Sequence, residues 1–153
     1  EWLRRLQKHV DKGNAEAQIM LGNDYRIGGP CLQQNFQRAF ELYERAAAQG
    51  NAQAQTYLGS CYSQGLGVEI DHDAAAKFYQ RAAEQGYPHA QATLEAVKWF
   101  RLAAEGNAEA LYNLGACYAK GHGVQQDFDE AMRLCKRAAA KGHAGAAAAV
   151  DQL

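Results

Sequence analysis

Apolar residues in this chain recur with the spacing of an α-helix. The clearest stripe places them at i, i+4, i+7 and i+8, and it consists of Ala54, Leu58, Cys61 and Tyr62. A second stripe follows after a short segment that contains glycine, and it consists of Ala75, Tyr79, Ala82 and Ala83. The pattern predicts two amphipathic helices joined by a turn.

Residues that suit helix ends bound these two predicted helices. Gly65 and Gly67 end the first helix and Gly86 ends the second, because glycine tolerates the left-handed backbone of a helix C-cap. The second helix begins at a position that carries Asn or Asp in each copy, namely Asn35, Asp71 and Asp127. Such a residue caps free backbone N–H groups, typically worth about 1 kcal/mol. Glu130 stands three residues after Asp127, the spacing of a capping box.

The helical hairpin is repeated along the chain. Leu21 and Leu58 are 37 positions apart, and Gly50 and Gly86 are 36 apart. A fixed period of this length indicates a stacked array, because one hairpin cannot bury its apolar face alone. We therefore expect one repeat domain over 1–153 that is divided as follows: 1–13, the second helix of a preceding repeat; 14–50 and 51–86, complete repeats; 87–106, a shortened repeat; 107–142, a complete repeat; 143–153, a partial C-terminal capping helix. Because the chain starts and stops in mid-pattern, we expect it to be part of a longer protein.

The shortened repeat has two interpretations. Gly86 and Gly106 are only 20 positions apart. In the first interpretation, 88–105 is one fused helix, which would place Leu94 nearly opposite Ala96 and would flip the packing phase downstream. In the second, residues between Leu94 and Glu95 are absent from this sequence. We favour the second, because nothing nearby compensates for a flipped phase.

The repeated frame resembles a known family. It reads Ala-x-x-x-Leu-Gly-x-x-Tyr-x-x-Gly-x-Gly-Val-x-x-Asp and continues as Ala-x-x-Tyr-x-x-Ala-Ala-x-x-Gly, and it is similar to the Sel-1-like repeat, a relative of the tetratricopeptide repeat. The resemblance covers nearly the whole chain. It implies an all-α fold, a right-handed α-solenoid of antiparallel helix hairpins that serves as a scaffold or adaptor for protein complexes. It implies no catalytic residues and no cofactor.

Small and aromatic residues of this frame are expected to have structural roles. Gly59 and Ala82 leave room for the two helices of one hairpin to approach closely, whereas Tyr62 and Tyr79 fill the wider spaces between repeats. Together with the capping residues, the set of expected structural residues is Gly22, Tyr25, Gly59, Tyr62, Gly115, Tyr118, Asn35, Asp71 and Asp127.

If the geometry is that of tetratricopeptide repeats, the first helices line a concave face. The expected binding residues on that face are Glu16, Ile19, Asn23, Arg26, Gln53, Thr56, Ser60, Ser63, Glu109, Tyr112, Ala116 and Lys120. Relatives that grip a peptide carboxylate use several Lys, Arg and Asn residues there, and only Asn23, Arg26 and Lys120 qualify here. The face is mostly neutral and polar, so we expect an extended segment or a partner protein as its ligand. The alternative is that these residues are only solvated.

Charge and hydropathy narrow the classes of partner. The chain has 16 basic and 17 acidic residues and a net charge of −1, without the basic excess of a nucleic-acid-binding protein. Basic residues do gather on the predicted helices 1–12 and 128–141, where they are expected to solvate an outer face. No apolar run approaches the ~18 residues that a membrane span needs.

The cysteines and histidines do not form a pattern of known chemistry. Cys61 and Cys117 occupy the same slot of the buried stripe, so both are read as small apolar fillers. A bridge between Cys117 and Cys135 is an alternative. No Cys-x-x-Cys or His-x-x-x-His pattern occurs, so a zinc site is not expected and a reducing compartment is favoured. A Cys117–His122 nucleophile lacks a third, orienting group.

The sequence therefore predicts a non-catalytic scaffold or adaptor that binds a protein or peptide partner on its concave face. A first alternative is a structural subunit held inside a large multiprotein assembly. A second is the repeat region of a larger enzyme, such as a ubiquitin ligase.

Overall fold

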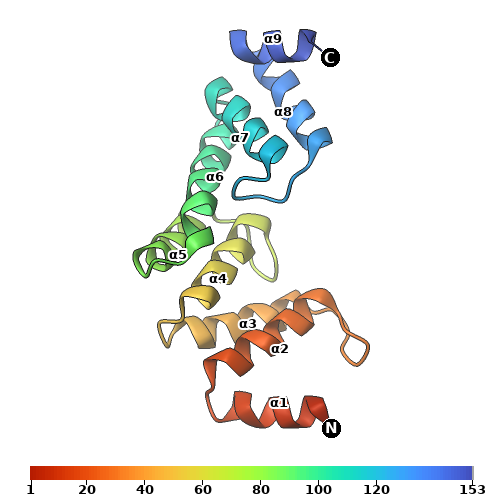
Figure 1. Cartoon of the computed structure of the whole chain (residues 1–153), viewed down its shortest axis with the longest axis vertical. Helices are drawn as coiled ribbons and strands as arrows, with labels where there is room; N and C mark the ends of the chain where they lie inside the picture. Colours follow the sequence, from red (N-terminus) through yellow and green to blue (C-terminus); the bar gives the residue numbers. More distant parts are fainter. Residues whose placement is uncertain (153) are drawn as a thin grey trace. The chain divides into compact units, whose positions relative to one another are not determined.

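The computed structural model describes residues 1–152, and within them it contains nine α-helices and no strand. Two compact units make up the chain, one over Glu1–Pro88 and the other from His89 onward. Figure 1 shows the helices as coiled ribbons from red at the N-terminus to blue at the C-terminus. The predicted all-α class is confirmed. Among the described residues, no helix combines the length and the apolar character that crossing a bilayer requires.

The first unit contains five helices: α1 (Trp2–Asp11), α2 (Ala15–Ile27), α3 (Phe36–Ala47), α4 (Ala52–Gln64) and α5 (His72–Glu84). Two hairpins form from them, α2 with α3 and α4 with α5, and α3 also packs against α4 (Figure 1). Residues of α1, α2 and α3 share one apolar cluster, which contains Leu6, Val10, Ala17, Leu21 and Leu42.

The second unit contains α6 (Pro88–Ala104), α7 (Ala108–Lys120), α8 (Phe128–Ala140) and α9 (Ala144–Asp151). Here α7 and α8 form a hairpin, and α9 packs on α8. One cluster unites all four helices, with Ala103, Ala110, Leu111, Leu114, Leu134, Ala138 and Ala146 at its buried centre.

The shortened repeat lies in α6, which runs without a break from Pro88 to Ala104. Its buried residues are Ala90, Ala96, Val97 and Ala103. Leu94 remains half-exposed, because it lies on the side of the helix away from Ala96. The sequence as given thus forms the fused helix of the first interpretation. Whether residues are missing between Leu94 and Glu95 stays a prediction.

The capping residues hold each hairpin loop at two points. The side chains of Asn35, Asp71 and Asp127 each accept a 3.0 Å hydrogen bond from the backbone N–H three residues further on. Their own backbone N–H groups donate to carbonyl oxygens on the first helix, at 2.8–2.9 Å, and those carbonyls belong to Tyr25, Tyr62 and Tyr118. The expected capping box is wrong, because the N–H of Asp127 is occupied in this way and the carboxylate of Glu130 binds Arg133 instead.

Glycine lets the helices of a hairpin touch. A Cβ atom added at Gly59 would lie 2.7 Å from Cε1 of Tyr79, and one added at Gly22 would lie 2.7 Å from Cε1 of Tyr43. Tyr79 was expected to fill the space between repeats, and this is wrong: because Gly59 has no side chain, the ring of Tyr79 lies over it within one hairpin. Tyr62 meets rings of two successive hairpins, stacking on Phe78 of its own and meeting Phe40 of the preceding one edge-on.

Candidate protein-binding surface

The candidate surface is built from the first helix of each hairpin. We use the term first-helix face for the outward-facing residues of α2 and α4 in one unit and of α7 in the other. Four of the expected binding residues are exposed: Glu16, Gln53, Glu109 and Lys120. Seven are half-buried: Asn23, Arg26, Thr56, Ser60, Ser63, Tyr112 and Ala116.

Ile19 does not belong to this face. Only 4% of its surface is exposed, because it packs against Ala46 and Ala54 at the contact between successive hairpins. The neighbouring Met20 is 50% exposed instead. With Glu16, Asn23 and Ile27 it forms one stripe along α2, since these residues are three or four positions apart. The helical period alone did not show which side of α2 the next hairpin covers.

Tyr43 reaches the first-helix face from the second helix. Its ring is fully buried over Gly22, and its hydroxyl donates a 2.6 Å hydrogen bond to Oδ1 of Asn23. This bond occupies Oδ1 of Asn23, so the amide of this half-buried side chain can still donate through Nδ2. Tyr43 is not among the expected binding residues, because all of those belong to the first helices. A glycine on the first helix that pairs with a tyrosine on the second is the signal that could have identified it.

The next hairpin repeats this arrangement with different atoms. Tyr79 lies over Gly59, and its hydroxyl shares a 3.0 Å hydrogen bond with Oγ of Ser60. Ser63 donates to the carbonyl oxygen of Ser60 at 3.2 Å. The hydroxyl of Thr56 donates to the carbonyl of Ala52 and is therefore occupied within its own helix. The face of α4 thus presents hydroxyl groups where α2 presents an amide.

Burial keeps both tyrosines protonated. Desolvation raises the pKa of Tyr43 far above its usual range, although the neighbouring guanidinium of Arg26 acts in the opposite direction. Desolvation also raises the pKa of Tyr79, although the neighbouring hydroxyl groups of Ser60 and Ser63 act in the opposite direction. Both hydroxyls are therefore neutral groups that hold the polar residues of the face in fixed orientations.

Arg26 is the one cation among the expected binding residues of the first unit. It is half-buried and lies beside the hydroxyl of Tyr43 and the thiol of Cys61. Its Nε atom is buried without a hydrogen-bond partner. The guanidinium also makes a side-chain hydrogen bond to the hydroxyl of Tyr43, so part of its donor capacity is used inside the hairpin. Asn23 Nδ2 and Arg26 together make the face of α2 rich in donors.

The first-helix face of α7 differs from that of α2 and α4. Cys135 replaces the tyrosine, with its Sγ 3.1 Å from a Cβ added at Gly115, and Ala116 replaces Asn23 and Ser60. No hydroxyl reaches the surface here from α8. Glu109 and Tyr112 both contact His143, which precedes α9: the Glu109 carboxylate lies 2.8 Å from Nε2, and the ring of Tyr112 stacks on the imidazole.

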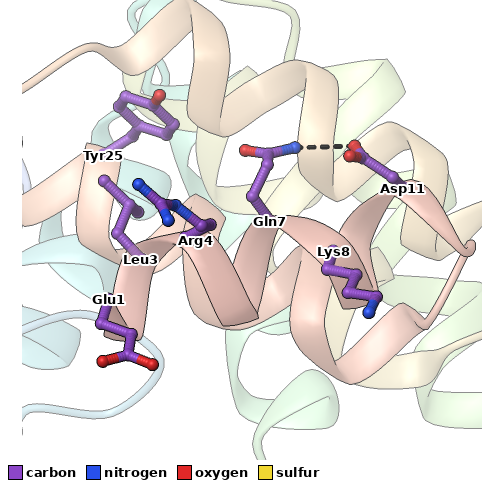
Figure 2. Close-up of a pocket in the computed structure, with 7 residues that line it drawn as sticks. All are labelled: Glu1, Leu3, Arg4, Gln7, Lys8, Asp11 and Tyr25. Carbon is purple, nitrogen blue, oxygen red and sulfur yellow. Dashed lines mark hydrogen bonds between the residues drawn. The ribbon is translucent and has the colours of Figure 1, made fainter.

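A separate hollow of about 620 Å³ lies along α1. Figure 2 shows its lining, in which Tyr25 comes from α2, Glu1 precedes α1, and the other residues, Leu3, Arg4, Gln7, Lys8 and Asp11, come from α1. Gln7 donates a 2.8 Å hydrogen bond to Asp11 along the rim. The hollow is open and mixed in polarity, and none of the expected binding residues lines it.

The described residues offer no arrangement for catalysis at a thiol or for metal binding. All four cysteines are free thiols. Burial raises the pKa of Cys61 to about 11 and also raises that of Cys117, so neither is a ready nucleophile. His122 pairs with Glu95 at 3.1 Å. Within residues 1–152, no group of three or more His, Cys, Asp or Glu side chains could hold a metal ion.

Helical hairpins of nearly constant length, each with a capped glycine turn, define a helical repeat protein. The Sel1 repeat family matches residues 15–51, 52–87, 92–107 and 108–143. The chain therefore belongs to the Sel1 repeat family, as the resemblance implied. Sel1 repeats generally mediate protein–protein interaction and are generally non-catalytic.

Two curated proteins illustrate the relationship. The chain is 33% identical over 108 residues to DAP3-binding cell death enhancer 1 of Rattus norvegicus. This alignment covers 70% of this chain and 17% of that protein. The chain is also 31% identical over 108 residues to the ERAD-associated E3 ubiquitin-protein ligase component HRD3A of Arabidopsis thaliana. This alignment covers 70% of this chain and 13% of that protein. The chain thus spans less than a fifth of the length of either relative.

A solved structure supports the fold. A protective antigen from uropathogenic Escherichia coli strains, described as displaying an SLR fold, aligns with a TM-score of 0.58 and 33% identity. The alignment covers 94% of this chain and 34% of the antigen chain. The predicted helical repeat solenoid is confirmed by this similarity.

Proposed function

We propose that the chain binds an extended segment of a partner protein on the first-helix face of α2 and α4. The observation that carries this proposal is the pair of tyrosine hydroxyls that orient Asn23 and Ser60 on that face. Side chains held in place lose little freedom on binding, which favours their use as recognition groups. Met20 and Ile27, 50% and 65% exposed, add apolar contact area beside them.

The contact between the two hairpins supports an extended ligand that crosses both first helices. Ile19 of α2 and Ala54 of α4 share one apolar cluster with Ala46 of α3. We expect a segment that crosses α2 and α4 to contact both Asn23 and Ser60, and the donors Asn23 Nδ2 and Arg26 suit its carbonyl or carboxylate oxygens.

A peptide selection tests this proposal. Peptides that bind the purified chain are selected from a display library, and their affinity is then measured for Asn23→Ala, Ser60→Ala and the double variant. Loss of one hydrogen bond at this face is expected to weaken binding about 3- to 10-fold. Gln80→Ala is the matched control, since it removes an exposed amide from the second helix α5. Equal losses in the control, or none in the face variants, contradict the proposal.

A second candidate function is a role as part of a larger protein or assembly that includes a ubiquitin ligase. It is favoured by the similarity to HRD3A, whose name describes a ligase component. In that case we expect the 153-residue chain to lack ubiquitin transfer by itself and to associate with a catalytic partner. Ubiquitin-transfer assays on the full-length protein, with and without this region, test the idea. Transfer that is unchanged without the region contradicts it.

A further inference from the structure

His143 occupies a position that asparagine holds elsewhere in the chain. Asn14, Asn51 and Asn107 precede α2, α4 and α7, and each side chain accepts a hydrogen bond of 2.8–3.0 Å from the backbone N–H three residues on. His143 precedes α9 in the same way, and its Nδ1 accepts from the N–H of Ala146 at 3.0 Å. The first helix of the last, partial repeat is therefore capped by a histidine in place of asparagine.

The imidazole of His143 also contacts two residues of the first-helix face on α7. Nε2 lies 2.8 Å from Oε2 of Glu109, and the ring stacks on Tyr112 with centroids 4.5 Å apart and planes at 25°. Gly145 makes room for this stack, since an added Cβ would lie 3.1 Å from Cε1 of His143 and 3.6 Å from Cζ of Tyr112. The His143 side chain is only 16% exposed in this arrangement.

These contacts require one tautomer of the neutral ring. Nδ1 accepts from Ala146 and so carries no hydrogen, whereas Nε2 carries the hydrogen and donates it to the carboxylate of Glu109. A second proton would be placed on Nδ1, where it would face the N–H of Ala146 and remove the cap. Histidine side chains ordinarily gain this proton near pH ~6.5, whereas the asparagine caps have no such state.

The charged and titratable groups near the His143 ring come from α7 and from the C-terminal end of α8. α7 provides Glu109 and Tyr112, and α9 carries no titratable side chain before Asp151. α8 has Arg137 in its last turn and is followed by Lys141, whose ammonium group lies by Gly106, 3.2 Å from an added Cβ there. Glu109 is thus the carboxylate in contact with the ring, and at 67% exposure its pairing with a protonated imidazole is weak.

The loss of the cap outweighs the gain of the ion pair. Removing an N-cap typically shifts a helix equilibrium about fivefold, and a cation at the helix N-terminus opposes the helix dipole as well. A median exposed ion pair shifts an equilibrium only about twofold. α9 is short, with eight residues, of which Ala146 is the buried one. Its attachment is therefore sensitive to a change of this size.

We propose that His143 is a pH-sensitive latch that docks α9 when neutral and releases it when protonated. Release frees Glu109 and Tyr112 on α7 and uncovers the apolar cluster around Ala146, which includes Ala110, Leu111 and Ala138. The consequence for binding rests on the proposed function of the first-helix face: when His143 is protonated, the α7 part of that face becomes available to a partner segment.

The latch is tested without any partner by comparing the wild type with His143→Asn, which installs the cap of the other first helices. Nitrogen NMR of the imidazole is expected to show the Nε2–H tautomer at pH 7.5. Between pH 7.5 and 5.5, the fraction of undocked α9, followed by the Ala146 amide resonance, should rise about fivefold in the wild type and stay constant in the variant. The Nδ1–H tautomer, or parallel behaviour of the two proteins, overturns the latch.

The link to binding has its own test. A peptide selected on the purified chain is measured against wild type and His143→Asn at both pH values, and tighter binding at pH 5.5 is expected in the wild type alone. If α9 is released but the affinity does not change, regulation by the latch is wrong while the proposed function stands. If no peptide binds at either pH, the proposed function fails, and the NMR comparison still decides the latch.

Discussion

The hydroxyl of Tyr43 donates a 2.6 Å hydrogen bond to Oδ1 of Asn23, which joins the second helix of a hairpin to the outer face of the first. The ring passes over Gly22, where an added Cβ would lie only 2.7 Å away. Three features of the sequence thus act together. A glycine on the first helix leaves room for a tyrosine ring from the second helix, and a polar residue next to the glycine forms a hydrogen bond with the tyrosine hydroxyl. Tyr79, Gly59 and Ser60 repeat the set.

Tyr43→Phe separates this hydrogen bond from the packing of the ring. The phenyl ring keeps its contacts over Gly22, so only the interactions of the hydroxyl with Asn23 and Arg26 are lost, and we expect the free energy of unfolding to fall by about 0.5–1.5 kcal/mol. Urea denaturation followed by circular dichroism measures the change. Tyr43→Ala is the comparison, because it also leaves a cavity and should cost about 3–5 kcal/mol. If Tyr43→Phe costs as much as Tyr43→Ala, the hydroxyl has a larger role than this bond.

Gly59→Ala tests the close approach of α4 and α5. The new methyl group would lie 2.7 Å from the ring of Tyr79, so the helices must move apart, at an expected cost of about 1–3 kcal/mol. Gly29→Ala is a matched control, because nothing lies within 4 Å of its added Cβ and its backbone is not left-handed. The control should change the free energy of unfolding by less than about 0.5 kcal/mol. Thermal or urea unfolding of both variants gives the comparison, and equal effects would contradict the packing argument.

Local pattern was enough to predict the helices of the hairpins and the residues that cap the second helices. Asn35, Asp71 and Asp127 were recognised because an N-cap depends on residues within one turn, and each makes the expected bond. The first-helix face was harder to predict. Helical periodicity places Ile19 and Met20 next to each other, and only the position of the next hairpin decides that Ile19 is buried and Met20 exposed.

Contacts between residues distant in the sequence were also missed. Gln18 is 2% exposed, and its Oε1 accepts a 3.1 Å hydrogen bond from Gln49, while Gln55 accepts one of 2.9 Å from Gln85. Buried polar residues cannot be assigned from local pattern, because the partner that satisfies them lies about thirty positions further along. The same limit applies to Tyr43 and Tyr79, whose hydroxyls act on the face of another helix.

The thiols supply a prediction about pH. Desolvation raises the pKa of Cys61 to about 11, above the usual thiol value near 8.5, so the folded state keeps a proton that the unfolded state loses as pH rises. The contribution of Cys61 to stability is therefore full below pH ~8.5 and declines between pH ~8.5 and 11. Cys61→Ala should show a smaller alkaline loss of stability than the wild type in urea denaturation at pH 7.5 and 9.5. Identical pH dependence in the two proteins would show that burial does not protect this thiol.

The same burial predicts selective alkylation. Cys31 is exposed in the loop after α2, whereas Cys61 and Cys117 are buried. Iodoacetamide at pH 8 should modify Cys31 first, because the reacting thiolate must be accessible and ionised. Peptide mass spectrometry measures the order, and a sample unfolded in urea is the control in which Cys61 and Cys117 react as well. Modification of Cys61 in the folded protein at the rate of Cys31 would contradict the buried stripe.

The buried glutamine of α2 allows a test in which size and polarity are separated. α7 carries Leu111, fully buried, at the position that Gln18 occupies in α2. Gln18→Leu keeps most of the volume and leaves the amide of the exposed Gln49 to bind water, so we expect the free energy of unfolding to stay within about 1 kcal/mol of the wild type. Gln18→Ala removes the volume too and should cost about 2–3 kcal/mol, because a cavity remains where the side chain packed. Urea denaturation of the two variants decides between packing and hydrogen bonding: equal losses would mean that the bond to Gln49, and not the filled space, stabilises this contact.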